Sequence, residues 1–287
     1  MRILVTGANG QLGMTFQSLA SEHPEHEFFF YTSKELDITD PDSIEAKFHE
    51  SKPEVAINCA AYTAVDQAEN EPEKAFAVNS DGVKNLVEAC RNFNSALIHI
   101  STDYVFDGTN HRPYAETDPV KPIGVYGQSK RAGEEAILDS SISALIIRTS
   151  WVYSEFGNNF VKTMLRLGKE RDELNVIFDQ IGTPSNTYDL AHAIMVAIEQ
   201  KSKWVGNQEI FHFSNEGVCS WYDFALTIFE IAGIDCKVNP ILSKDYPTKA
   251  ERPHYSVLDK TAFKNSFNIQ IPNWRSSLGS SVILSND

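Results

Sequence analysis

A glycine-rich loop directly after the first apolar run constrains the fold of this chain more than any other feature. The run Arg2–Thr6 is followed by Gly7-Ala8-Asn9-Gly10-Gln11-Leu12-Gly13, and a helical pattern begins inside this loop. Glycines let backbone N–H groups and a helix N-terminus approach a phosphate, which a Cβ atom would keep away. The spacing G-x-x-G-x-x-G differs from the commoner G-x-G-x-x-G. The loop predicts a dinucleotide-binding unit, and the alternative is a glycine-rich turn without a ligand.

The first part of the chain alternates between apolar, strand-like runs and helical stretches. This alternation is typical of a doubly wound parallel sheet. The predicted strands are residues 2–6, 27–32, 55–58, 96–101 and 144–149. The predicted helices are residues 11–21, 41–51, 71–92 and 125–139. Asp40-Pro41 marks one helix start, with the aspartate as cap and the proline at the first helical position. We therefore expect an α/β fold with a Rossmann-like sheet.

The alternation becomes looser after Trp151. Helical patterns at 160–167 and 189–199 and a strand pattern at 210–214 indicate that the chain returns to the sheet before it ends. We expect an interleaved division into a Rossmann-like core and a smaller C-terminal substrate-binding lobe. The core comprises residues 1–153 and 186–215, and the lobe comprises residues 154–185 and 216–287.

Charge and composition argue against several classes of protein. The 287 residues carry a formal net charge of −14, which repels nucleic acids and anionic membranes. No apolar run approaches the roughly 20 residues of a membrane span, and the opening strand leaves no room for a secretion signal. The four cysteines form no C-x-x-C pair, which favours buried thiols over zinc or disulfides. We expect a cytoplasmic protein.

The end of the second predicted strand bears on the choice of cofactor. NAD-selective Rossmann domains usually place an acid there, on the ribose 2′-hydroxyl. This chain instead reads Tyr31-Thr32-Ser33-Lys34, and the lysine could meet the 2′-phosphate of NADP. Asp37 follows and either contacts the adenosine or serves as a turn residue before Asp40. We expect NADPH in preference to NADH, with NADH as the alternative.

Three residues in the order Thr102, Tyr126 and Lys130 indicate chemistry on a carbonyl group. Thr102 follows the fourth predicted strand, where a doubly wound sheet binds its ligands. Tyr126 and Lys130 lie four residues apart, on one face of a predicted helix. The cation could favour the phenolate, the phenol could protonate a substrate oxygen, and the threonine hydroxyl could bind that oxygen. Each residue alone is more often a cap, a half-buried ring or a solvated charge.

The chain resembles the extended short-chain dehydrogenase/reductase superfamily through this trio behind a glycine loop. Longer stretches resemble the dTDP-4-dehydrorhamnose reductase family within it, and the resemblance runs from the first strand to about Trp274. The matching stretches are Asn58-Cys59-Ala60-Ala61-Tyr62-Thr63-Ala64-Val65-Asp66-Gln67-Ala68-Glu69, Ser101-Thr102-Asp103-Tyr104-Val105-Phe106-Asp107-Gly108, Arg148-Thr149-Ser150-Trp151-Val152-Tyr153, Asn158-Asn159-Phe160-Val161-Lys162-Thr163-Met164-Leu165-Arg166-Leu167 and Tyr246-Pro247-Thr248-Lys249-Ala250-Glu251-Arg252-Pro253.

The resemblance implies an activity and a set of site residues. That family reduces the C4 ketone of dTDP-4-dehydro-L-rhamnose to dTDP-L-rhamnose, a sugar donor for bacterial surface polysaccharides. The resemblance assigns Thr102, Tyr126 and Lys130 to catalysis, the last holding the cofactor ribose. The implied cofactor-binding residues are Gly7, Gly10, Gln11, Leu12, Gly13, Asp37, Ile38, Ala61, Tyr62, Thr63, Tyr126 and Lys130. The implied substrate-binding residues are Thr102, Asp103, Trp151 and Arg252, the arginine on the diphosphate.

The chain departs from the family at a metal site. Some members are described with magnesium held by glutamates at a dimer contact, and the matching positions here are Thr15 and Tyr188. Neither residue is the hard carboxylate ligand that magnesium prefers. We therefore expect no metal at this site, and either a monomer or a homodimer.

Three alternatives stay open beside reduction of this ketone. A nucleotide-sugar dehydratase of the same superfamily typically has Asp-Glu after the threonine, whereas this chain has Asp103-Tyr104. A non-catalytic subunit resembling the regulatory subunit of methionine adenosyltransferase would keep the fold as a binding module. Another nucleotide-sugar reductase would keep the same trio. Oxidation of the cofactor on addition of the keto sugar would separate these alternatives.

Overall fold

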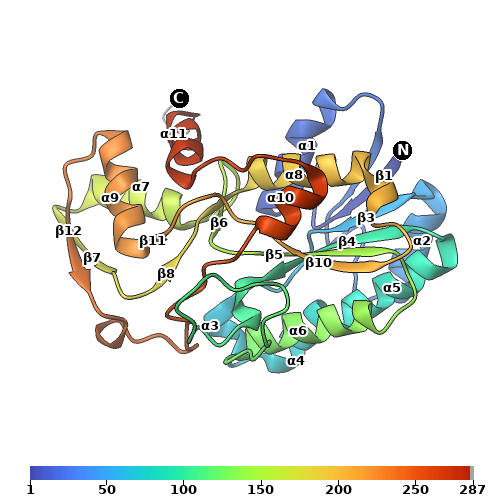
Figure 1. The fold of residues 1–287 in the computed structure, drawn as a ribbon, viewed down its shortest axis with the longest axis horizontal. Coiled ribbons are helices and arrows are strands. Elements are labelled where there is room, and N and C mark those ends of the chain that lie inside the picture. Colours follow the sequence, from blue (N-terminus) through green and yellow to red (C-terminus); the bar gives the residue numbers. More distant parts are fainter. Residues whose placement is uncertain (285–287) are drawn as a thin grey trace.

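Six parallel strands form the central sheet of the protein (Figure 1). The computed structural model describes residues 1–284. The strands pair in the order β10-β5-β4-β3-β1-β2, and each neighbouring pair is parallel. The predicted parallel α/β sheet is therefore confirmed. The strands are β1 (Arg2–Thr6), β2 (Glu27–Tyr31), β3 (Val55–Asn58), β4 (Ala96–Thr102), β5 (Ala144–Thr149) and β10 (Gln208–His212).

Helices cover both faces of this sheet, as a doubly wound fold requires. One face carries α1 (Gln11–Leu19), α8 (Thr187–Glu199) and α10 (Thr261–Phe267), and the other carries α2 (Pro41–Ser51), α5 (Gly82–Phe93) and α6 (Val125–Leu138). The strand order changes direction between β1 and β3. Ligands of open α/β sheets bind at such a switch point, outside the carboxyl ends of the strands. The glycine loop lies there.

Most predicted elements agree with the structure within two or three residues. The cap of α2 is confirmed, because Asp40 Oδ1 accepts a hydrogen bond from Asp42 N at 3.1 Å. The strand predicted at 210–214 begins two residues earlier, at Gln208. The single helix predicted at 71–92 is wrong. It is divided into α4 (Pro72–Phe76), a π-helical turn (Ala77–Asp81) and α5, and the turn directs Asn79 to the backbone of Tyr62.

A third group of elements packs at one end of the sheet, around an apolar core of its own (Figure 1). It comprises β7 (Glu173–Ile177), β12 (Lys237–Ile241), α7 (Phe160–Glu170), α9 (Trp221–Ala232) and α11 (Trp274–Leu284), with β7 parallel to β12. Short strands connect it to the large sheet, namely β6 (Val152–Tyr153), β8 (Ile181–Gly182), β9 (Ser185–Asn186) and β11 (Cys219–Ser220). Residues 285–287 of the predicted lobe lie outside the described part of the chain.

Two expectations from composition can be compared with residues 1–284. In that range, every helix is too short or too polar to cross a membrane. All four cysteines are free thiols, three of them buried, so the predicted thiols are confirmed. Burial raises the pKa of each thiol.

Candidate functional site

The glycine loop between β1 and α1 forms a close-fitting backbone turn. Gly7 has a φ of +62°, and a Cβ on it would lie 2.7 Å from Ala60 N at the end of β3. A Cβ on Gly13 would lie 2.4 Å from the Gly7 carbonyl oxygen. Gly10 is the N-cap of α1, and in the described structure no side chain caps this helix. The first-turn N–H groups of α1 are therefore directed outward, as phosphate binding requires.

Gln11 connects this loop to a distant segment. Its Oε1 accepts hydrogen bonds from Ser154 Oγ at 3.1 Å and from Asn159 Nδ2 at 3.0 Å. Asn159 is also the N-cap of α7, accepting from Lys162 N at 3.1 Å. The predicted cofactor residue Gln11 thus fixes the start of α7 to the glycine loop, while Leu12 is buried beneath it.

The end of β2 contains an acid that the sequence analysis did not consider. Glu35 Oε2 accepts hydrogen bonds from Thr32 N and Thr32 Oγ1, each at 2.9 Å. These bonds, the backbone bond first, lower the pKa of Glu35. Asp37 Oδ1 accepts from Thr39 N at 2.9 Å, so Asp37 does serve as a turn residue. A carboxylate and Lys34 therefore both lie where an adenosine ribose would bind.

The segment Ala61-Tyr62-Thr63 after β3 is held by a buried asparagine that sequence reasoning missed. Asn79 Oδ1 accepts from Tyr62 N at 2.9 Å, and Asn79 Nδ2 donates to the Tyr62 carbonyl at 3.0 Å. The same amide donates to Ser129 Oγ on α6 at 3.0 Å. Asn79 thus joins the predicted cofactor segment to the helix that carries Tyr126 and Lys130.

Another acid positions the first turn of α6. Gly124 is the N-cap of this helix and has no side chain to cap it. Glu69 Oε1 instead accepts a hydrogen bond from Val125 N at 2.8 Å. A carboxylate at a helix N-terminus also interacts favourably with the helix dipole. Glu69 therefore fixes the start of α6, one residue before Tyr126.

Thr102 and Tyr126 meet at the carboxyl end of β4. Thr102 Oγ1 donates its hydrogen to Asp103 Oδ1 at 3.0 Å, and the same hydroxyl lies close enough to the Tyr126 phenol to influence its pKa. Burial is the main influence on Tyr126 and raises its pKa to about 12, while the Thr102 hydroxyl acts in the opposite direction. The phenol is therefore a protonated donor at neutral pH.

Burial, rather than Lys130, decides the pKa of this phenol in the structure. Lys130 was expected to lower the pKa of Tyr126, but that pKa is raised. Lys130 is 2% exposed, and its Nζ donates to the Ile100 carbonyl oxygen at 2.6 Å. Burial lowers the pKa of Lys130 itself to about 8. The spacing of four residues places both side chains on one face of α6, yet the amine is directed at the backbone of β4.

Asp103 lies beside Thr102 in a buried position. Burial raises its pKa to about 6, whereas hydrogen bonds from Ser256 and Thr102 oppose this rise. Its Oδ2 is buried, without a partner of good hydrogen-bond geometry in the described chain. Ser256 reaches the site because its N–H donates to the Ile181 carbonyl at 2.8 Å. No local pattern in the sequence indicates this serine.

Trp151, the predicted sugar contact, stacks on a second indole. The ring centroids of Trp151 and Trp221 are 3.6 Å apart and the planes are nearly parallel. Gly182 packs closely against Trp151, because a Cβ on this glycine would lie 2.6 Å from the indole. Trp151 has a φ of +47°, unusual for a bulky side chain. Backbone strain of this kind clusters at functional sites.

Arg252 is engaged by an acid in this structure. Its guanidinium donates to Asp66 Oδ2 at 2.7 Å and to Asp66 Oδ1 at 3.2 Å. Asp66 Oδ1 also accepts from Ala250 N at 3.1 Å, and these bonds, led by the arginine, lower the pKa of Asp66. Tyr104 lies between the arginine and Tyr126, since its phenol bonds Arg252 and its ring meets the Tyr126 ring edge-on at 5.4 Å.

A cavity of 590 Å³ adjoins Arg252. It is lined mainly by residues 242–254, and Lys244 and Lys249 add two more cations that sequence reasoning missed. Asp179 and Glu251 also line this cavity, so an anionic ligand there would have to lie on the side of the lysines and the arginine.

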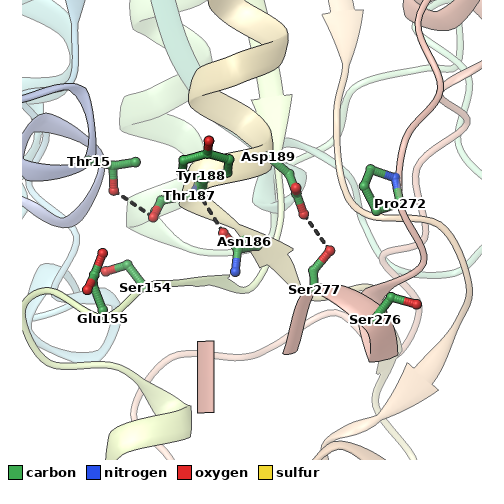
Figure 2. A pocket seen from close by; sticks show the side chains of 10 residues that line it. All are labelled: Thr15, Ser154, Glu155, Asn186, Thr187, Tyr188, Asp189, Pro272, Ser276 and Ser277. Atoms are coloured by element: carbon green, nitrogen blue, oxygen red, sulfur yellow. Dashed lines mark hydrogen bonds between the residues drawn. The ribbon is translucent and has the colours of Figure 1, made fainter. Parts of the chain in front are cut away.

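A second cavity, of 420 Å³, lies between α1, α8 and α11, and none of Thr102, Tyr126 and Lys130 lines it (Figure 2). It includes Thr15 and Tyr188, the positions at which the family's metal site was considered. Thr15 Oγ1 lies 2.7 Å from Thr187 Oγ1, and Tyr188 is half exposed. Asp189 in this cavity accepts a hydrogen bond from Asn215 Nδ2 at 2.6 Å. These contacts do not form a carboxylate cage for magnesium.

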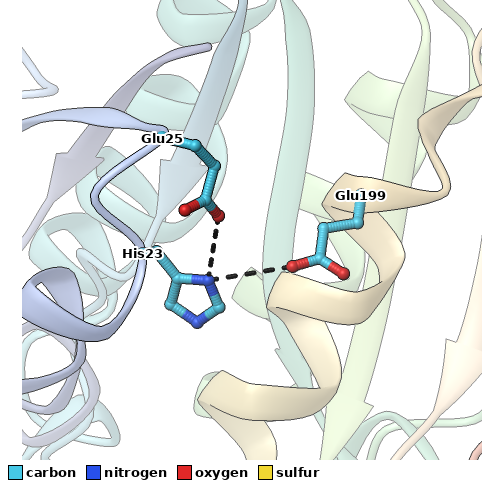
Figure 3. Close-up of side chains that lie close together, drawn as sticks. All are labelled: His23, Glu25 and Glu199. Atoms are coloured by element: carbon cyan, nitrogen blue, oxygen red, sulfur yellow. Dashed lines mark hydrogen bonds and ion pairs between the residues drawn. The ribbon is translucent and has the colours of Figure 1, made fainter.

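One group of possible metal ligands occurs among the described residues, comprising His23, Glu25 and Glu199 (Figure 3). His23 Nδ1 lies 3.4 Å from Glu25 Oε1 and 3.7 Å from Glu199 Oε1. Both carboxylates are about half exposed, so water solvates them without an ion. We assign no function to this cluster.

Comparison with known proteins identifies the family of this chain. The family model for the RmlD substrate binding domain matches residues 1–284. The dTDP-4-dehydrorhamnose reductase of Aggregatibacter actinomycetemcomitans is 46% identical over 286 residues, which cover 96% of this chain and 97% of the relative.

Two solved structures named dTDP-4-dehydrorhamnose reductase are also similar. The protein from Clostridium acetobutylicum ATCC 824 has a TM-score of 0.94 and 41% identity, covering 100% of both chains. The protein from Bacillus anthracis str. Ames, in complex with NADP, has a TM-score of 0.94 and 39% identity, covering 99% of each chain. The chain therefore belongs to the dTDP-4-dehydrorhamnose reductase family.

Proposed function

We propose that this protein reduces the C4 ketone of dTDP-4-dehydro-L-rhamnose to dTDP-L-rhamnose with NADPH. One observation carries this proposal most directly. Within a chain of this family, the Thr102 hydroxyl meets the Tyr126 phenol at the carboxyl end of β4, where ligands of a doubly wound sheet bind.

Tyr126 is the proposed proton donor. NADPH supplies the hydride that is added to C4 of the sugar. The ketone oxygen gains negative charge as its carbonyl π bond breaks, and Tyr126 transfers its phenolic proton to that oxygen. Because burial raises the pKa of Tyr126 to about 12, the phenol holds this proton until the oxygen becomes strongly basic.

Thr102 is the proposed partner of the same oxygen. Its hydroxyl donates to Asp103 Oδ1 in this structure and could turn to donate to the substrate carbonyl, close to the Tyr126 phenol. A hydroxyl in this place stabilises negative charge on either oxygen during proton transfer. Lys130 would hold the cofactor ribose from the next turn of α6, and its positive charge would favour the phenolate once the proton has left.

The glycine loop fits a dinucleotide. A Cβ on Gly7 or Gly13 would fall within 3 Å of backbone atoms, so the turn is shaped by the absence of side chains at both positions. Gln11, Leu12, Asp37 and Ile38 would border the pyrophosphate and adenosine, and residues 61–63 would border the nicotinamide side. Lys34 supports NADPH over NADH, whereas Glu35 opposes it.

The substrate would bind between this loop and the C-terminal segments. Asp103 and Trp151 would contact the sugar, and Arg252 would exchange Asp66 for the diphosphate, with Lys244 and Lys249 nearby. We assign this lobe to residues 154–185 and 216–287, as expected from the sequence. A monomer or homodimer in the cytoplasm, with no nucleic-acid partner, completes the proposal.

Tyr104 supports reduction over dehydration. A dehydratase typically has a glutamate here as an additional acid–base group. In this chain, Tyr104 instead packs edge-on against Tyr126 and bonds Arg252. Burial is the main influence on Tyr104 and raises its pKa further, so it is a poor base for removing a proton from carbon.

The direct test is oxidation of NADPH, followed by absorbance, on addition of dTDP-4-dehydro-L-rhamnose. We expect turnover by the unaltered protein, and a decrease in kcat of about 10²- to 10⁴-fold for Tyr126→Phe. NADPH affinity should be unchanged in this variant. Tyr188→Phe, at a half-exposed tyrosine away from the trio, is the matched control. Turnover by Tyr126→Phe at the control's rate would refute the proposed proton donor, and inactive wild type would favour a binding module.

A further inference from the structure

The buried end of Lys130 faces a histidine that the proposed mechanism does not use. Lys130 Nζ lies 3.3 Å from His99 Nε2 and donates to the Ile100 carbonyl oxygen. His99 lies on β4 and is fully buried. Two nitrogens at this distance can share only one hydrogen bond. The position of the proton on His99 therefore decides which charge state of the lysine the contact favours.

The amide of Asn58 is held in one orientation. Ala60 N–H donates to Asn58 Oδ1 at 3.2 Å, and Thr6 Oγ1 donates to the same oxygen at 2.7 Å. A backbone N–H can only donate, so the amide atom that faces it is the oxygen rather than the nitrogen. Asn58 Nδ2 is thereby directed at His99 Nδ1, 3.0 Å away.

This orientation fixes the tautomer of His99. The amide nitrogen of Asn58 offers only hydrogens, so His99 Nδ1 accepts and carries no proton. Burial, followed by the charge of Lys130, lowers the pKa of His99 well below its usual value, which keeps the ring neutral. A neutral imidazole has one N–H, and here it must be at Nε2. That N–H is directed at Lys130 Nζ.

An ammonium group has three donors and no acceptor, whereas a neutral amine has a lone pair. We propose that His99 is a positioning residue: held as its Nε2–H tautomer by Asn58, it donates to Lys130 Nζ and stabilises the neutral amine. The amine can still donate to Ile100 O. Thr6, Asn58, His99 and Lys130 then form one chain of hydrogen bonds with a single direction.

Some of the remaining groups around Lys130 lower its pKa, and others raise it. Burial is the largest influence and lowers the lysine pKa to about 8, the same direction as the His99 contact. Glu134, one turn further along α6, opposes it with its negative charge. That carboxylate is already bound by Arg148 from β5 at 2.7 Å and by Ser101 from β4 at 2.6 Å.

Two further groups complete the surroundings of the lysine. Cys59, at the end of β3, would favour the ammonium only as a thiolate, and burial raises its pKa. Tyr126, on the same face of α6, stays a neutral phenol because its pKa is also raised. His99 is thus the neutral group whose hydrogen bonds decide whether Lys130 is favoured as the ammonium or as the neutral amine.

For the proposed reaction, this chain of hydrogen bonds would bring the pKa of Lys130 near the pH at which the enzyme works, instead of far above it. The lysine would then limit activity at high pH, where the neutral amine no longer favours the Tyr126 phenolate. This consequence alone rests on the proposed function. The charge state of Lys130 can be measured without substrate.

The first experiment determines the tautomer in the unaltered protein. Two-bond ¹H–¹⁵N correlation spectra of ¹⁵N-histidine-labelled protein should show His99 protonated at Nε2 and unprotonated at Nδ1. The signal is assigned by its loss in His99→Phe. A proton at Nδ1 would overturn the inference, and this result is read from the unaltered protein without any reaction.

The second experiment titrates Lys130 through its ¹³Cε signal, assigned with Lys130→Arg. His99→Phe keeps the ring volume but removes the N–H, so we expect the lysine pKa to rise by about one unit. His26→Phe is the matched control, because His26 is also buried, with 7% of its side chain exposed, but it lies before β2. An unchanged or lower lysine pKa in His99→Phe would contradict the inference.

The third measurement is the pH profile of kcat/KM. In His99→Phe, the fall in activity at high pH should move upward together with the lysine titration. If the pKa of Lys130 rises in His99→Phe but the pH profile of kcat/KM does not change, the role of His99 in catalysis would be refuted. Lack of turnover by every variant, wild type included, would instead refute the proposed function and leave the two spectroscopic results standing.

Discussion

The two halves of the candidate site differ in how far apart their parts lie in the sequence. The proposed pyrophosphate cradle is one loop, Gly7 to Gly13, packed on the end of the neighbouring strand β3. The proposed substrate side consists of Asp103, Trp151 and Arg252, which contact residues from other segments of the chain, namely Ser256, Trp221 and Asp66.

This difference predicts different responses to substitution. The cradle is shaped by backbone contacts at fixed short distances, so it cannot adapt to an added side chain. The substrate side is held by side chains that already pair with each other, such as Arg252 with Asp66. A ligand there competes with existing contacts, so substitution should change affinity and stability by degrees.

The largest effect is expected for Gly13→Val. A Cβ on Gly13 would lie 2.4 Å from Gly7 O, and relieving this overlap must displace the loop or the helix start. We expect a roughly 10- to 100-fold rise in the Kd for NADPH, measured by fluorescence titration. Gly279→Ala on α11 is the control, because no atom lies within 4 Å of the added Cβ among those described. Equal NADPH affinity in both variants would show that the cradle is adaptable.

Next in size is the effect of Asp103→Asn on stability. Burial raises the pKa of Asp103 from 3.8 to about 6. The folded state thus binds more protons between these values, so the ionised carboxylate destabilises the fold as pH rises through this window. Above pH 6, Asp103→Asn should be more stable by roughly 2 kcal/mol.

Urea unfolding at pH 8 and at pH 4 measures this effect. The advantage of Asp103→Asn should be present at pH 8 and much smaller at pH 4, where the folded carboxyl is protonated and the unfolded carboxyl, with its ordinary pKa of 3.8, is partly protonated. Asp107→Asn is the control, since hydrogen bonds, chiefly from Thr109 N, lower the pKa of this exposed carboxyl. A stabilisation that does not depend on pH would mean that Asp103 is ionised at no significant cost. Turnover should fall if the carboxylate contacts the sugar.

Arg252→Ala should have a smaller effect, confined to the substrate. The diphosphate would lose its charge-assisted bonds, so KM for the nucleotide sugar should rise about tenfold. Arg252→Lys keeps the charge but loses the planar guanidinium, so its KM for the nucleotide sugar should lie between those of the wild type and Arg252→Ala. NADPH affinity should be equal in all three proteins. A parallel loss of NADPH affinity would show that the two halves of the site are coupled through Tyr104.

The same division explains what the sequence could predict. The glycine loop, the Asp40 cap and the order Thr102, Tyr126 and Lys130 depend on neighbouring residues or on strand ends, which local patterns indicate. The sheet and all six of its strands were predicted in this way, because apolar runs alternate with helical periods.

The parts that were missed depend on contacts between distant segments. Trp221 stacks on Trp151, and Ser256 reaches Asp103, through packing that no local pattern encodes. The rise in the Tyr126 pKa was missed for a related reason. Helical spacing places Lys130 on the correct face, but burial and the Ile100 carbonyl, both tertiary features, determine the charges.

The smallest effect is expected at the end of β2, where the cradle meets the adenosine. Glu35 is bound to Thr32 beside Lys34, and its carboxylate would repel a 2′-phosphate across solvent. Because the acid is exposed, water and salt screen this repulsion. Glu35→Gln should therefore raise the preference for NADPH over NADH by only about threefold in kcat/KM.

The control for this prediction is Lys34→Gln, which should shift the preference in the opposite direction. Both shifts should shrink as salt is added, since the interactions are solvent-exposed. If the ratio of kcat/KM with NADPH to kcat/KM with NADH is equal in the two variants, neither residue interacts with the group at the ribose 2′ position. Selectivity would then have to come from Thr32, Ser33 or the backbone at the start of the loop. In that case the cofactor side, like the substrate side, would depend on several separate segments of the chain.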